Sequence, residues 1–196
     1  MYPSLVPLIL FCFVAAFTPG PNNILGSYSG FNFGIKKSIP LILGVAFGYP
    51  FLLIILAAGL IIVFKTYPVL QIILKVCGSG FLIYLAYKIS FQNKVQQQTV
   101  TNPVKFFHTF IFQFINPKGV IIAVITISTF VETGSNYLFH SIVVIAVSFC
   151  CAITSITSWC LLGKFLRRFA TNEKFIQIFN YVMSFLLIVC VIMFYL

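Results

Sequence analysis

Two short polar segments interrupt long apolar runs in this sequence, and each holds proline next to asparagine. The first reads F-T-P-G-P-N-N-I-L-G at residues 17–26, and the second reads F-Q-F-I-N-P-K-G at residues 112–119. Proline lacks the backbone N–H, and its ring clashes with the carbonyl four residues earlier, so each segment should break a helix. We call these segments the first break and the second break.

A helix that restarts within an apolar run presents a polar backbone end to its surroundings. Pro21 and Pro117 suit the first position of such a helix, with Gly20 and Asn116 as the caps before them. The restarted helix offers free N–H groups and a positive dipole end, and the interrupted helix leaves carbonyls nearby. Together they could bind the carboxylate and the ammonium of a zwitterionic amino acid. The alternative is a pair of packing kinks, because proline is tolerated in membrane helices.

The candidate binding side chains gather around the two breaks. Lys118 lies about 12 residues, or roughly 18 Å, into its apolar run, which is a long way to reach the interface. We expect it to contact a substrate carboxylate. The predicted substrate-binding residues are Thr18, Pro19, Gly20, Pro21, Asn22, Asn23, Gln113, Asn116, Pro117, Lys118, Ser155 and Ser158.

The two serines in that set belong to a stripe of small polar residues in a later apolar run. The stripe consists of Ser148, Cys151, Thr154, Ser155 and Ser158. Their spacing places them on one face of a helix. Such a face lines a wet path or packs closely against another helix, and the sequence leaves both readings open.

The elements that carry these residues are membrane helices. The chain is 61% hydrophobic and 7% charged, with a mean hydropathy of +1.10. Apolar runs of about 20 residues indicate membrane spans, each of which must satisfy its own backbone as a helix. The predicted spans are Leu5–Phe31, Ile39–Phe64, Val69–Phe91, Phe106–Val131, Tyr137–Leu162 and Phe175–Leu196.

We therefore predict an all-α integral membrane protein of one domain, residues 1–196, with no separate soluble domain. Its six transmembrane helices would form two inverted three-helix repeats, over about residues 1–92 and 105–196, joined by a polar linker at about 92–104. Helices 1 and 4 carry the breaks, at Pro19 and Pro117. Matched interruptions in two inverted halves indicate a transporter's substrate site near the membrane midplane.

The basic residues predict an orientation. If the spans alternate, nine of them fall on one side: Lys36, Lys37, Lys88, Lys94, Lys105, Lys164, Arg167, Arg168 and Lys174. By the positive-inside rule that side is cytoplasmic, so both termini of this multi-pass protein face outward. We expect it in the inner membrane of a bacterium, in contact with lipid. The net charge of +10 does not predict nucleic-acid binding, because the basic residues lie at helix ends.

The six cysteines all lie in apolar runs and lack metal-ligand spacing with histidine. We expect them to be small buried hydrophobes, and we predict no metal and no cofactor.

At these residues the sequence resembles the LysE/RhtB family of amino-acid exporters. The resemblance rests on T-P-G-P-N-N-I-L at residues 18–25, G-V-A-F-G at 44–48, L-K-V-C-G-S-G-F-L-I-Y-L-A-Y-K at 74–88 and N-P-K at 116–118. It covers nearly the whole chain. Within the family the sequence is most similar to the cysteine/O-acetylserine exporters, through P-G-P-N-N-I-L, I-S-T-F-V at 127–131 and the ending M-F-Y-L.

One departure from the family bears on energy coupling. The resemblance implies export coupled to the proton gradient, and many family members carry an aspartate after the glycines of the second span. Here Tyr49 and Pro50 follow Gly48, the chain has no aspartate, and its two glutamates, Glu132 and Glu173, lie at span ends. Proton antiport through a buried carboxylate is thus unsupported. A histidine, water or the substrate's own ionisation could carry the proton instead.

We predict a secondary transporter, not an enzyme, that exports small amino acids or derivatives from the cytoplasm by alternating access. Cysteine or O-acetylserine is the first expectation, and another neutral amino acid such as threonine or homoserine is the next. The alternatives are a membrane channel or structural membrane subunit, and an intramembrane thiol or electron carrier. Gly44 and Gly48 form a G-x-x-x-G that predicts close helix contact, and the glycine-rich second span leaves a homodimer open.

Overall fold

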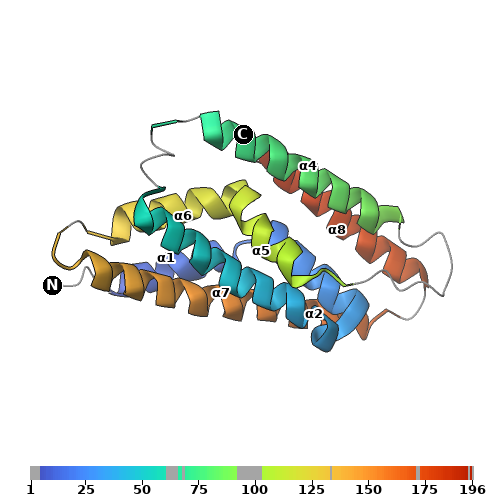
Figure 1. Cartoon of the computed structure of the whole chain (residues 1–196). Helices are drawn as coiled ribbons and strands as arrows, with labels where there is room; N and C mark the ends of the chain where they lie inside the picture. The colour runs from blue at the N-terminus through green and yellow to red at the C-terminus, as the bar shows by residue number, and fades with distance from the viewer. Residues whose placement is uncertain are drawn as a thin grey trace.

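The computed structural model describes residues 5–60, 66–67, 69–91, 103–132, 134–170, 173–193 and 195, and the regular elements among them are all helices. They are α1 Leu5–Phe17, α2 Pro21–Ile55, the π-helical turn η1 Leu56–Leu60, α4 Val69–Phe91, α5 Phe106–Ile115, α6 Pro117–Phe130, α7 Tyr137–Arg167 and α8 Glu173–Met193 (Figure 1). The prediction of an all-helical chain is confirmed.

Helix α2 is two helices joined by a reversal at Gly34. Gly34 has φ 74° and ψ 171°, a backbone conformation that is essentially restricted to glycine. The hydroxyls of Ser29 and Ser38 lie 2.7 Å apart across it. Nine residues of straight helix would separate them by about 13.5 Å, so the chain must turn back here.

By length and composition, three helical segments in the described part of the chain could cross a membrane: Pro21–Gly59, which contains the Gly34 reversal, Tyr137–Arg167 and Lys174–Ile192. The α5–α6 pair qualifies as a fourth span if its 64° bend is counted within one crossing. Leu5–Phe17 and Val76–Ser90 are shorter apolar helices.

Glycines let α2 approach its neighbours closely. A Cβ on Gly30 would overlap the Cys160 carbonyl of α7, and one on Gly163 would overlap the Ser27 carbonyl. A Cβ on Gly44 or Gly48 would likewise collide with α5. The predicted close contact at the G-x-x-x-G motif is confirmed, and its partner is a helix of the same chain.

Helices α4 and α8 pack side by side along one edge of the molecule (Figure 1). Ser184 of α8 donates to the Ala86 carbonyl of α4 at 2.7 Å. The pair joins the other helices through Asn32, which donates to Asn180 at 3.0 Å, and through Gly78, whose missing Cβ makes room for Ile115 and Pro117. The α4–α8 pair thereby covers the second break.

Several of the basic residues gather at one end of the bundle. Arg167 lies over the Phe31 ring at 5.4 Å, and Phe31 also stacks on Phe175 at the start of α8. Lys88 and Lys105 line a second cavity there. The C-terminal ends of α4 and α7 therefore lie near the Gly34 reversal, because Phe33 and Lys88 line the same cavity and Arg167 contacts Phe31.

Several helix ends lie close to the limits of the predicted apolar runs, and the division into six spans stays a prediction. The run Leu5–Phe31 is interrupted after Phe17, as expected, and α7 extends five residues beyond Leu162. Most of the predicted polar linker and the end of the span predicted to reach Phe64 lie outside the described residues.

Candidate functional site

The two breaks lie against each other. The Phe11 and Phe130 rings contact each other with centroids 5.7 Å apart, the Lys118 ammonium donates to the Thr18 carbonyl, and Asn22 donates to Gln113. Residue numbers rise along one element as they fall along the other. The α1–α2 segment and the α5–α6 segment are thus antiparallel, and they touch where each is broken.

Proline and its preceding residue shape both breaks. Gly20 is extended, with φ −170° and ψ 178°, and Pro21 begins α2. Asn116 has φ −79° and ψ 104°, and Pro117 begins α6. The predicted caps and restarts are confirmed. Asn116 makes no side-chain hydrogen bond to the helix that it caps, so its amide is available for other contacts.

An amide pair joins the breaks. Asn22 donates through Nδ2 to Oε1 of Gln113 at 2.8 Å, and Gln113 returns a bond from Nε2 to Oδ1 of Asn22 at 3.2 Å. Gln113 is fully buried and also donates to the Thr109 carbonyl at 2.7 Å. Both side chains are held in place before any substrate arrives.

Carbonyls freed at the first break are satisfied by side chains. Asn23 donates through Nδ2 to the carbonyls of Ala16 and Thr18, at 2.8 and 3.0 Å. Ser155 of α7 donates to the same Ala16 carbonyl at 2.8 Å. These two predicted site residues hold the break in shape.

Lys118 reaches across to the first break. Its Nζ donates to the Thr18 carbonyl at 2.8 Å and to the Pro19 carbonyl at 3.3 Å. A Cβ on Gly20 would lie only 3.0 Å from this ammonium, so glycine leaves the room that the lysine uses. In this structure the ammonium that we expected to meet a carboxylate binds backbone oxygen.

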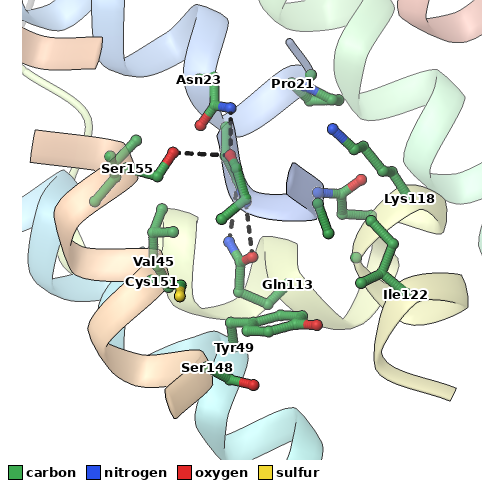
Figure 2. A pocket seen from close by; sticks show the side chains of 18 of the residues that line it. Pro21, Asn23, Val45, Tyr49, Gln113, Lys118, Ile122, Ser148, Cys151 and Ser155 are labelled. Atoms are coloured by element: carbon green, nitrogen blue, oxygen red, sulfur yellow. Dashed lines mark hydrogen bonds between the residues drawn. The ribbon is translucent and has the colours of Figure 1, made fainter. Parts of the chain in front are cut away.

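A cavity of about 80 Å³ lies at the junction of the breaks (Figure 2). Helices α1, α2, α5, α6 and α7 contribute to its wall. It is lined by Cys12, Ala15, Ala16, Gly20, Pro21, Asn22, Asn23, Val45, Tyr49, Gln113, Asn116, Lys118, Gly119, Ile122, Ser148, Cys151, Ala152, Ser155 and Ile156. Lys118 is the one charged residue in this lining.

Asn116 supplies the unused polar atom of the cavity. The residue is 3% exposed, and its Oδ1 has no hydrogen-bond partner among the described residues. A buried acceptor without a partner costs about 1–3 kcal/mol. This oxygen is therefore ready to accept a bond from a ligand.

The cavity wall away from Lys118 is formed by small or weakly polar side chains. Cys12 lies 3.6 Å from the Ser148 hydroxyl, and Tyr49 and Cys151 line the same region. The sequence reasoning missed Cys12 and Tyr49 as lining residues. Tyr49 had a signal, since it stands where many family members carry aspartate.

Some predicted site residues do not line the cavity. Thr18 and Pro19 contribute their carbonyls to Lys118, while Pro117 packs against Gly78. Ser158 does not line the cavity, because its exposed hydroxyl donates to the Thr154 carbonyl at 2.8 Å. Some members of the predicted polar stripe therefore line the cavity and others do not.

Three members of the polar stripe line the cavity, namely Ser148, Cys151 and Ser155. Thr154 instead donates to the carbonyl of Cys150 within its own helix. All six cysteines are free thiols; Cys12, Cys160 and Cys190 are buried as expected, whereas Cys77 and Cys150 are exposed, so the expectation was wrong for those two. The described residues hold no group of three or more His, Cys, Asp or Glu side chains suited to a metal ion.

Apolar helices whose two proline breaks meet at a cavity are typical of a membrane transport protein. The sequence pattern of the family described as "LysE type translocator" matches residues 13–196. The chain belongs to this family, and it is a multi-pass membrane protein for amino-acid efflux rather than an enzyme.

Relatives along the full length carry the name "Cysteine/O-acetylserine efflux protein". The one from Escherichia coli O1:K1 / APEC is 27% identical over 197 residues, which cover 98% of each chain. The one from Escherichia coli O157:H7 is 27% identical over 194 residues, again 98% of each. The Shigella flexneri relative is 27% identical over 197 residues, 96% of this chain and 98% of its own. No solved structure matches the chain.

Proposed function

We propose that this protein exports a small neutral amino acid from the cytoplasm by alternating access, with cysteine or O-acetylserine as the first candidates. The observation that carries the proposal is the junction of the two breaks around one cavity that holds an unpartnered acceptor, Asn116 Oδ1. The names of the relatives support the substrate class.

The substrate's carboxylate would bind at the helix restarts. The first N–H groups of a helix have no acceptor within it, so those of Asn22 and Asn23 in α2 and of Lys118 and Gly119 in α6 are available. Two positive dipole ends add to the attraction for an anion. The substrate's ammonium would donate to Asn116 Oδ1 and to nearby carbonyls.

Size favours a small substrate. The cavity of about 80 Å³ is several times the roughly 10–15 Å³ that one water needs, which suits a small ligand. The substrate's side chain would extend toward Cys12, Tyr49 and Cys151, where a thiol or short ester meets soft, weakly polar groups.

Six crossings would carry the site. The α1–α2 and α5–α6 segments are broken and antiparallel, as inverted repeats require of helices 1 and 4. The Gly34 reversal would separate the first crossing from the second. The basic end of the bundle would face the cytoplasm, which places both termini outside, in a bacterial inner membrane. Exposed apolar side chains such as Ile72, Ile121 and Phe185 would contact lipid.

Export from cells that express the chain tests the proposal. The medium would be assayed for O-acetylserine, cysteine, threonine, homoserine and lysine. We expect selective release of one compound, loss of that release in Asn116→Ala, and normal release in Ser158→Ala, whose hydroxyl lies outside the cavity. No release of any compound despite membrane insertion would contradict the proposal. Release that fails to saturate would favour a channel.

A further inference from the structure

The Lys118 ammonium lies at the first break, where the proposed function also places the substrate's ammonium. Its Nζ donates hydrogen bonds to the Thr18 and Pro19 carbonyls, at 2.8 and 3.3 Å. The carbonyls lie at the first break, and Gly20 between them and α2 lines the cavity. An amino acid's ammonium has three donors, and Asn116, a described residue of the cavity wall, holds a buried acceptor without a partner, Oδ1.

We propose that Lys118 is the proton carrier of the transport cycle and competes with the substrate's ammonium for these carbonyls. This rests on the proposed function. When the substrate binds from the cytoplasm, Lys118 loses one proton to water, and the neutral amine leaves the carbonyls to the substrate. After release outside, Lys118 takes one proton from that side, and its ammonium returns to the Thr18 and Pro19 carbonyls.

The balance of the cycle is one amino acid out and one proton in. With substrate bound, Lys118 is neutral and the zwitterion adds no net charge to the cavity. With the cavity empty, Lys118 is protonated, so the protein carries one positive charge as it returns to the inward-facing state. Burying two adjacent cations at one set of carbonyls would be costly, and proton loss avoids that cost. Because the returning form is positive, an inside-negative membrane potential favours the return as well.

Among the described residues, no other group that faces Lys118 suits this role. The thiol of Cys190 on α8 interacts electrostatically with Lys118, and Cys12 of α1, Tyr49 of α2 and Cys151 of α7 line the same cavity. All of these are neutral when protonated, so none holds a cation at the carbonyls. No described titratable side chain of α4, α5 or η1 lines the cavity.

Both glutamates and both histidines stand at other positions along the chain. Glu132 follows α6, 14 residues or about 21 Å of helix rise beyond Lys118, and Glu173 begins α8. His140 lies eight residues, about 12 Å, from Ser148 along α7 and 3.9 Å from Glu132. His108 is exposed at the basic end, in the second cavity.

Proton release on substrate binding is the direct test. Purified protein in weakly buffered detergent would be mixed with the exported amino acid between about pH 5.5 and 7, below the range in which an α-amino group titrates. We expect wild type to release one proton per substrate bound, and its apparent affinity to rise about tenfold per pH unit. Lys118→Met should bind without proton release and without this pH dependence.

Two further variants separate the roles. Lys118→Arg keeps a cation that does not deprotonate, so we expect it to lose most substrate binding. Lys164→Met makes the same chemical change in the last turn of α7, outside the cavity, and should behave as wild type. In proteoliposomes, Lys118→Met should exchange labelled for unlabelled substrate but fail to accumulate it against a pH gradient.

Each outcome decides the inference. Proton release that persists in Lys118→Met overturns it, because another group then carries the proton. Loss of binding in Lys118→Met, with an unchanged elution profile and helix content, also overturns it and makes Lys118 a ligand of the carboxylate. If wild type binds none of the five amino acids, the proposed function fails instead.

Discussion

The amide pair of Asn22 and Gln113 offers a quantitative test of how the two breaks are held together. Its two reciprocal bonds measure 2.8 and 3.2 Å, and Gln113 makes a third bond to Thr109 at 2.7 Å. Side-chain hydrogen bonds between membrane helices contribute about 0.6 kcal/mol each on average. Gln113→Met should therefore lower the free energy of unfolding by about 1.8 kcal/mol.

A double-mutant cycle with Asn22→Ala isolates the pair. We expect the double variant to be less destabilised than the sum of the single variants by about 1.2 kcal/mol, the value of the two shared bonds. The assay is equilibrium unfolding in mixed micelles, followed by helical circular dichroism. The control cycle joins Gln113→Met with Ser158→Ala, whose hydroxyl bonds only within α7, and should show no coupling. A coupling below about 0.3 kcal/mol between Asn22 and Gln113 would refute the reasoning.

Three other outcomes follow from close contacts and from the cavity wall. Gly30→Ala places a Cβ on the Cys160 carbonyl and should lower the free energy of unfolding by about 3 kcal/mol in the same assay. Gly80→Ala, with open space around its Cβ, should leave that free energy unchanged. Equal stability of the two variants would contradict the packing of α2 on α7. Gly34→Ala should cost about 1–3 kcal/mol because of its positive φ, and an unchanged unfolding curve would argue against the reversal. Saturating substrate should slow the reaction of Cys151 with a small thiol reagent but not that of exposed Cys150, and equal protection of both would place the substrate elsewhere.

The sequence was sufficient to predict the helical elements and the two breaks, because these follow from local chemistry. Apolar run length sets the helices, and Pro21 and Pro117 determine where α2 and α6 restart. Most of the predicted polar residues at the breaks, including Asn22 and Gln113, also line the cavity.

The division of roles among those residues required the three-dimensional arrangement. Asn22 and Asn23 bond within the protein, while Asn116 is left with an unused oxygen, and spacing along the chain does not distinguish them. The position of the Lys118 ammonium depends on the antiparallel meeting of the breaks, 100 residues apart. Tyr49 reaches the cavity from the second part of α2, which only the reversal at Gly34 brings back toward the breaks.

Equilibrium binding of the exported amino acid to purified wild type and Asn116→Ala tests the central claim most directly. A hydrogen bond to a charged group contributes about 1.5–3 kcal/mol, so the account predicts that Asn116→Ala weakens binding at least about tenfold. The matched control, Thr154→Ala, removes a polar group outside the cavity and should bind as wild type does. Undiminished binding by Asn116→Ala would contradict the claim that the substrate occupies the junction of the two breaks.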